Sequence, residues 1–116
     1  MKRISIMLLV IVSSQLQAQV RKPYTVTGKV NRVNSGKIYL EVYDNGVETK
    51  DSVKLGDGGD FSFKGKVSAA ANAYMHLSGS KEYLDFYLEP ANITVAADAN
   101  NFKKATIKGS VLNDDN

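Results

Sequence analysis

The amino-acid sequence predicts an all-β protein, an antiparallel β-sandwich of about seven to eight short strands preceded by a signal peptide. Three observations indicate this fold class. Apolar and polar residues alternate with a period of two from Tyr24 onward, the pattern of strands with one buried face. Turn-forming Gly, Asn and Asp residues interrupt the alternation at short, regular spacings. No segment has the 3.6-residue periodicity of an amphipathic helix, so parallel strands joined by helical crossovers are not expected.

The alternating pattern occurs in eight segments separated by turn residues. These segments cover residues 24–30, 37–43, 49–55, 61–67, 73–77, 83–88, 93–97 and 105–108. The Asp44-Asn45-Gly46 turn predicts a hairpin, because Asn and Gly tolerate the positive φ of tight hairpin turns. Residues 68–72 are small and fit either a loop or one helical turn, and residues 100–101 fit an Asn-rich turn.

The first eighteen residues have the pattern of a secretory signal peptide. Lys2 and Arg3 form a basic start, residues 4–12 form an apolar run, and a polar stretch ends at Ala18, so we expect cleavage between Ala18 and Gln19. A membrane-spanning helix needs about 20 apolar residues, roughly twice the length of this run. The sequence contains no cysteine, which excludes the lipid anchor of bacterial lipoproteins. We therefore expect a periplasmic or secreted protein without membrane attachment after cleavage.

Length and composition limit what the mature chain can be. A chain of 116 residues suits one domain, and the absence of cysteine excludes disulfides, thiolate metal sites and dithiol redox motifs. Lys and Arg number fifteen against twelve Asp and Glu, and two of the fifteen belong to the signal peptide. The remaining excess of one positive charge gives no reason to expect nucleic acid as a partner.

Residue types that carry chemistry do not form a catalytic or metal-binding pattern. His76 is the only histidine, and neither Tyr74 nor Ser78 beside it is a metal ligand of the usual kind. Asp57 and Asp60 flank two glycines, but the alternating oxygen ligands of a calcium loop are absent, so a structural turn is the favoured interpretation. We therefore expect a protein that is not an enzyme and has no metal or cofactor.

The tyrosines are the most informative residues. Five of the six have the parity opposite to the aliphatic residues of their strands: Tyr39, Tyr43, Tyr74, Tyr83 and Tyr87. If their strands share one sheet, its outer face is rich in tyrosine, with Glu41, His76 and Asp85 in between. Such a face fits ordinary cross-strand pairing, at about 0.2–1 kcal/mol per pair. It also fits a docking or ligand-binding face, since tyrosine makes both apolar and hydrogen-bonding contacts.

The strand and turn segments include, in this order, Thr27-Gly28-Lys29-Val30, Gly36-Lys37-Ile38-Tyr39-Leu40, Asp51-Ser52-Val53, Gly59 to Val67, Phe86-Tyr87-Leu88-Glu89, Asn92-Ile93-Thr94-Val95 and Gly109-Ser110-Val111-Leu112-Asn113-Asp114. Their order and spacing resemble the domain-of-unknown-function family 4369. The resemblance implies an N-terminal accessory domain of envelope thiol–disulfide oxidoreductases, which precedes a thioredoxin-like, peroxiredoxin-related domain. In that arrangement the Gly-Ser-x-x-Asn-Asp segment leads into a helical linker, whereas this sequence ends at Asn116 without a redox domain.

These observations predict a non-catalytic accessory or binding domain. We expect a signal peptide at 1–18, a short tail at 19–23, the sandwich at 24–112 and a C-terminal tail at 113–116 that begins the linker in longer family members. The partner that the resemblance implies is a thioredoxin-like envelope protein. An independent module that binds a ligand such as a glycan, and a truncated gene product without its own activity, are the alternatives. The oligomeric state stays open, because edge strands can pair with another chain.

Overall fold

The computed structural model describes residues 20–33 and 35–114. The expected signal peptide and its cleavage site at Ala18 and Gln19 lie outside the described residues. Within the described residues, no helix is long and apolar enough to cross a membrane.

Eight strands form most of the described chain. They are β1 (Lys22–Asn31), β2 (Lys37–Asp44), β3 (Val47–Lys54), β4 (Asp60–Val67), β5 (Ala71–Leu77), β6 (Leu84–Leu88), β7 (Asn92–Asp98) and β8 (Thr106–Lys108). Three short helical segments accompany them: the 3-10 turns η1 (Asp57–Gly59) and η2 (Ala99–Lys104), and α2 (Val111–Asp114).

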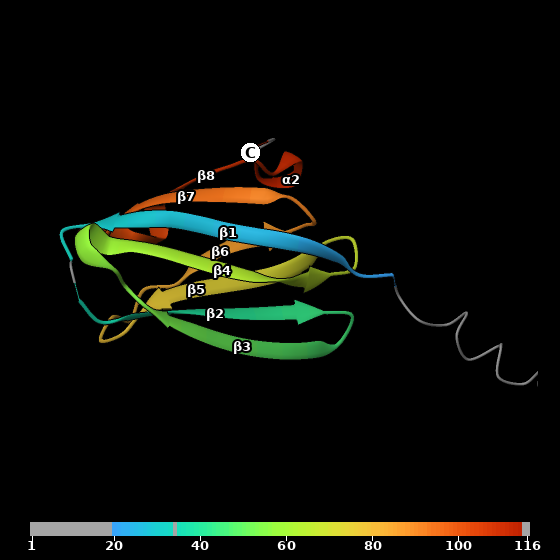
Figure 1. Cartoon of the computed structure of the whole chain (residues 1–116), viewed down its shortest axis with the longest axis horizontal. Helices are drawn as coiled ribbons and strands as arrows, with labels where there is room; N and C mark the ends of the chain where they lie inside the picture. The colour runs from blue at the N-terminus through green and yellow to red at the C-terminus, as the bar shows by residue number, and fades with distance from the viewer. Residues whose placement is uncertain (1–19, 34, 115–116) are drawn as a thin grey trace, which may run out of the picture.

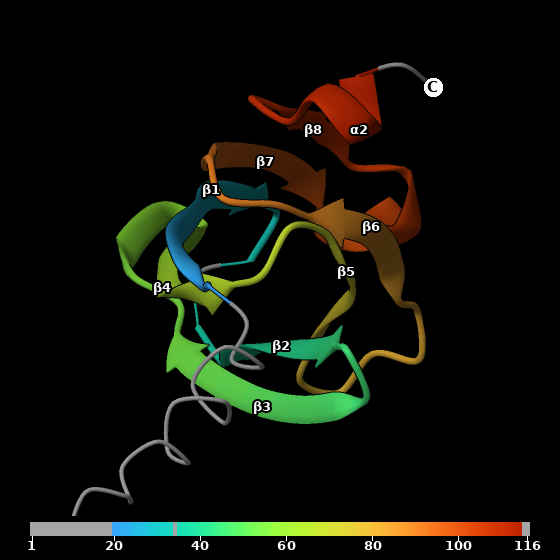
Figure 2. The ribbon, with the colours of Figure 1, turned by 90° about the vertical axis from the view of Figure 1, so that its right-hand side faces the viewer.

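The strands form two four-stranded sheets that pack face to face. The first sheet has the order β4-β1-β7-β8 and the second the order β3-β2-β5-β6. Figure 1 shows the strands side by side, and Figure 2, which looks along them, shows the two layers and α2 beside β8. The β-sandwich that the alternating sequence pattern predicts is therefore confirmed.

One pair of strands differs from the prediction. β1 and β7 run parallel, with Val26 opposite Ile93 and Gly28 opposite Val95, while every other pair within the two sheets is antiparallel. The expectation of no parallel strands is wrong here, because it assumed that a helix must connect parallel neighbours. Between β1 and β7 the chain instead passes through the second sheet and β4, and those strands provide the crossover.

The core lies between the sheets and is built from the inward-facing residues of each strand. Ile38, Leu40, Met75 and Phe63 are almost completely buried. Phe102 is also fully buried, although the sequence around it predicts only an Asn-rich turn. The 3-10 turn η2 directs this ring into the core, where burial of a phenylalanine side chain contributes about 1.5–3 kcal/mol.

The segments between the strands refine three further expectations. Ala71 and Asn72 begin β5 rather than belonging to a loop or a helical turn, and Asn113 lies in α2. Gly59 has a φ of +85°, and a Cβ atom there would collide with the Val30 carbonyl oxygen. The glycine cluster at 56–60 is therefore a turn that packs closely against β1, as the structural interpretation of Asp57 and Asp60 predicts.

Candidate functional site

The structure brings the five predicted tyrosines onto the outer surface of the second sheet, named here the tyrosine face. Tyr39 and Tyr43 come from β2, Tyr74 from β5 and Tyr87 from β6, while Tyr83 immediately precedes β6. Their arrangement follows from the period-two geometry of strands, because the intervening residues Ile38, Leu40 and Val42 all point into the core.

Strand register arranges the tyrosine face in rows across the sheet. One row places Tyr39 opposite His76. The next row places Tyr74 between Glu41 and Asp85. A third row places Asn72 between Tyr43 and Tyr87. Aromatic rings and polar side chains therefore alternate in both directions, with Glu41, His76 and Asp85 among the tyrosines.

Three rings lie in contact at one end of the tyrosine face. The His76 ring lies parallel to the Tyr39 ring, with centroids 4.8 Å apart and an interplanar angle of 11°. On its other side His76 contacts Tyr83 at a centroid distance of 4.6 Å. Glu41 Oε2 lies 3.7 Å from His76 Nε2, close enough for an ion pair when the imidazole is protonated. The lone histidine thus lies within an aromatic stack beside a carboxylate.

Tyr43 is held by two carboxylates at the other end of the tyrosine face. Its hydroxyl donates to Glu48 Oε2 at 2.9 Å and approaches Glu41 Oε1 at 3.4 Å. Chiefly the hydrogen bond to Glu48, together with the nearby negative charges, raises the pKa of Tyr43 to about 12. Its ring packs edge-on against Tyr74 with centroids 5.5 Å apart. Tyr43 is therefore a neutral, oriented phenol at physiological pH.

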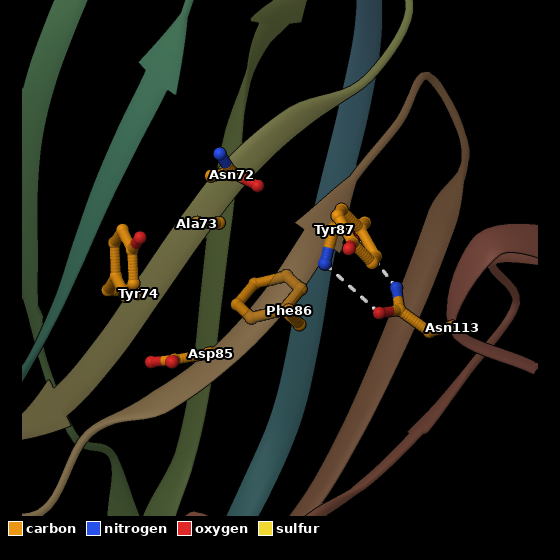
Figure 3. A pocket seen from close by; sticks show the side chains of 7 residues that line it. All are labelled: Asn72, Ala73, Tyr74, Asp85, Phe86, Tyr87 and Asn113. Atoms are coloured by element: carbon orange, nitrogen blue, oxygen red, sulfur yellow. Dashed lines mark hydrogen bonds between the residues drawn. The ribbon is translucent and has the colours of Figure 1, made fainter. Parts of the chain in front are cut away.

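A hollow of about 360 Å³ opens on the tyrosine face over β5 and β6. Its lining includes Asn72 and Tyr74 from β5, and Asp85 and Tyr87 from β6. Figure 3 shows Tyr74 and Tyr87 on opposite sides of this hollow. Asn113 from α2 completes its outer edge.

Asn113 binds the edge of β6 as a neighbouring strand would. Its side-chain Nδ2 donates to the Tyr87 carbonyl oxygen at 2.7 Å, and the Tyr87 N–H donates to its Oδ1 at 3.0 Å (Figure 3). The amide thus satisfies both backbone groups of Tyr87 on the open edge of the second sheet. This pair of hydrogen bonds holds the residue that carries one wall of the hollow.

The residues just before Asn113 fix its position. The buried Ser110 hydroxyl donates to Glu89 Oε1, and the Leu112 N–H donates to the same oxygen at 3.1 Å. These hydrogen bonds, foremost that of Ser110, lower the pKa of the Glu89 carboxyl below its ordinary value. Gly109 has a φ of +90°, and a Cβ there would collide with the Asn92 carbonyl oxygen. The Gly-Ser-x-x-Asn segment is therefore a structural clamp on β6.

A comparison with protein-family sequence models identifies the family to which the chain belongs. The sequence model of the family described as Domain of unknown function (DUF4369) matches residues 24–116. The chain belongs to this family. Searches of the curated proteins and of the solved structures found no match.

A second cavity of the DUF4369 domain, of about 390 Å³, lies where β3 and β4 come close to each other. Buried Asp44 lines it, and its Oδ2 accepts hydrogen bonds from the Ser68 N–H at 3.1 Å and the Ser68 hydroxyl at 3.2 Å. Arg21 lies 3.6 Å from the same oxygen. These contacts fasten the β2–β3 hairpin to the loop after β4, so Asp44 has a structural role.

The described part of the DUF4369 domain contains no group of three or more His, Asp or Glu residues placed to hold a metal ion.

Two residues that line the hollow are not predicted as site residues by the sequence pattern. From the sequence, Asn72 belongs to a stretch of small residues and Asn113 to a C-terminal tail. Only the pairing of Asn72 with Tyr87 and the contact of Asn113 with that same residue reveal them. Neither relation has a local signal in the sequence.

Proposed function

We propose that this DUF4369 domain is an exported, non-catalytic accessory domain that docks a partner protein through its tyrosine face. The observation that carries the proposal is the gathering of five tyrosines and one histidine on one sheet face. Tyr43 is 38 % exposed, and Tyr83 and Tyr87 are each 47 % exposed, although their rings have large apolar surfaces. Tyrosine is enriched at protein interfaces, because it combines a large apolar ring with a hydrogen-bonding hydroxyl.

Preorganisation supports a binding role for these rings. His76 contacts the rings of both Tyr39 and Tyr83, and Tyr43 is hydrogen-bonded to Glu48. These contacts restrict side chains that an isolated strand would leave mobile. Side chains that are already ordered lose less conformational entropy on association. Docking through the tyrosine face therefore loses less side-chain conformational entropy than docking through a face of exposed lysines.

The resemblance to accessory domains of envelope thiol–disulfide oxidoreductases supports a thioredoxin-like envelope protein as the partner. In this arrangement the sandwich positions the partner, and all redox chemistry belongs to the partner. The expected signal peptide directs the domain to the compartment in which such proteins act. Intact-mass measurement of the exported chain tests this step, and a mass that retains residues 1–18 contradicts it.

Crosslinking in cells followed by mass spectrometry tests the docking surface. We expect the wild-type domain to crosslink to a thioredoxin-like envelope protein and the Tyr43→Ala/Tyr83→Ala variant to lose most of that product. The matched control is Thr27→Ala/Thr94→Ala, which changes exposed positions on the outer face of the first sheet. Equal crosslinking of both variants, or no thioredoxin-like product with the folded wild type, overturns the docking proposal.

A further inference from the structure

We propose that the hollow between Tyr74 and Tyr87 is a binding site for one pyranose unit of a neutral glycan. The proposal rests on the proposed function only in that both use the tyrosine face. It assigns a ligand class to the region of the tyrosine face over β5 and β6. The residues that line this region do not include Tyr83, Tyr39 or His76. At about 360 Å³ the hollow falls within the range of about 300–1,000 Å³ that is usual for small-molecule sites.

Sheet register gives the hollow two aromatic and two polar corners. Asn72 pairs with Tyr87 and Tyr74 pairs with Asp85, so the two tyrosines lie on one diagonal and the two polar residues on the other. The Ala73–Phe86 pair lies between these two pairs, and its side chains point into the core. Ala73 and Phe86 therefore line the hollow between its corners, and the four corners are outward-pointing side chains (Figure 3).

The polar corners match the hydroxyl groups of a sugar. Neither the Asn72 nor the Asp85 side chain forms a hydrogen bond or ion pair with another residue in the described ranges 20–33 and 35–114. The Asp85 carboxylate offers two acceptor oxygens, and the Asn72 amide offers both a donor and an acceptor. A sugar hydroxyl both donates and accepts, so adjacent hydroxyls of one ring can use both corners.

The aromatic corners match the C–H faces of the same sugar. A pyranose ring presents apolar C–H groups on its two faces and hydroxyls around its rim. The rings of Tyr74 and Tyr87 lie on opposite sides of the hollow and offer apolar surface to those C–H groups (Figure 3). The alternation of aromatic and polar corners therefore corresponds to the alternation of apolar faces and polar rim in the ligand.

Both aromatic corners are held in place by contacts within the protein. Tyr74 packs edge-on against Tyr43, whose hydroxyl is bonded to Glu48. The Asn113 amide forms hydrogen bonds with both the N–H and the carbonyl oxygen of Tyr87. A site that is formed before the ligand arrives loses less entropy on binding.

A cationic amine is the competing ligand, because a carboxylate between two aromatic rings also suits an ammonium group. An ammonium ligand would use the acceptors of Asp85 and Asn72 but leave the Asn72 amide N–H without a role. A ring of hydroxyls uses both the donor and the acceptors. The two ligand classes are separated by direct titration.

The test is titration calorimetry of the folded domain with cellotriose, maltotriose, mannotriose and N,N′,N″-triacetylchitotriose, and with choline chloride as the cationic probe. We expect at least one trisaccharide to bind saturably, and amide NMR shifts to be largest at residues 72–74 and 85–87. The Tyr87→Ala and Asp85→Ala variants each lose contacts with the sugar, so each should bind the trisaccharide about tenfold or more weakly than the wild type.

Tyr83→Ala is the matched control, since Tyr83 and Tyr87 are equally exposed at 47 % but only Tyr87 lines the hollow. This variant should bind the trisaccharide with unchanged affinity, and Tyr87→Phe should retain most of it. Absence of binding to all four trisaccharides, binding of choline alone, or an equal loss in Tyr83→Ala overturns the saccharide site. Because the docking test uses Tyr43 and Tyr83, a failed saccharide titration leaves protein docking standing, and a failed crosslink leaves the saccharide site standing.

Discussion

The two outer faces of this sandwich have the same architecture but different chemistry. The first sheet exposes mostly small or charged side chains, among them Thr27, Lys64 and Thr94. The tyrosine face of the second sheet instead exposes aromatic rings, of which Tyr39 stacks on His76, Tyr83 contacts His76 at a tilt and Tyr43 packs edge-on against Tyr74. Both sheets have four strands and cover the same core.

This difference indicates that the fold itself does not require the tyrosines. Threonine has a β-branched side chain that suits a half-exposed strand, and the first sheet shows that such residues suffice on the outer surface. Its cross-strand contacts include the hydrogen bond from the Thr25 hydroxyl to Asn92 Oδ1 at 2.9 Å. The aromatic residues of the second sheet are therefore the ones that the proposed docking and saccharide binding would account for.

The largest change in the free energy of unfolding is expected on substitution of Asn113, whose side chain is hydrogen-bonded to β6, the edge strand of the second sheet. Asn113→Ala removes both hydrogen bonds to the Tyr87 backbone, and at about 0.5–1.5 kcal/mol each this loss lowers the free energy of unfolding by about 1–3 kcal/mol. Chemical denaturation measures this change, and hydrogen exchange at the Tyr87 amide should accelerate. Unchanged exchange there would show that the clamp does not hold β6.

A smaller loss of stability is expected when tyrosines of the tyrosine face are replaced by threonine, the residue found on the outer face of the first sheet. In Tyr43→Thr/Tyr87→Thr the strands keep residues of good β-propensity, so the free energy of unfolding should fall by no more than about 1 kcal/mol per lost pair. The same denaturation experiment on Thr27→Ala/Thr94→Ala provides the reference for the first sheet. A collapse of stability in the tyrosine variant would favour ordinary cross-strand pairing as the reason for these residues.

The difference between the faces was visible in the sequence, whereas its detailed geometry was not. Period-two alternation placed Ile38, Leu40 and Val42 inside and Tyr39 and Tyr43 outside, because a strand allows only these two directions. It could not tell which strands are neighbours, since pairing between β2, β5 and β6 depends on contacts that are distant in the chain. The parallel pairing of β1 with β7 was missed for the same reason.

The hollow illustrates a similar limit. Tyr74, Asp85 and Tyr87 stand out by residue type and parity, so the sequence directed attention to them. Asn72 and Asn113 are polar residues in segments that read as a loop and a tail. Their roles depend on register and on the docking of α2 against β6, which single-residue patterns do not encode.

The smallest expected effect concerns the titration of Tyr43, which the first sheet cannot match because its described outer face has no aromatic residue. The pKa of Tyr43 is raised to about 12, so the folded state favours the neutral phenol. Its stabilising contribution is complete below the ordinary tyrosine pKa of 10.0 and is lost as the pH rises through about 12. Burial raises the pKa of Tyr24 as well, so absorbance titration of the phenolates should show two late-titrating tyrosines in the wild type. The step at about pH 12 should disappear in Tyr43→Phe and move toward lower pH in Glu48→Gln, because the Tyr43 hydroxyl donates to Glu48, while the Tyr24 step stays in both variants. An unchanged number of late-titrating phenols in Tyr43→Phe would contradict the paired-carboxylate geometry at this end of the tyrosine face.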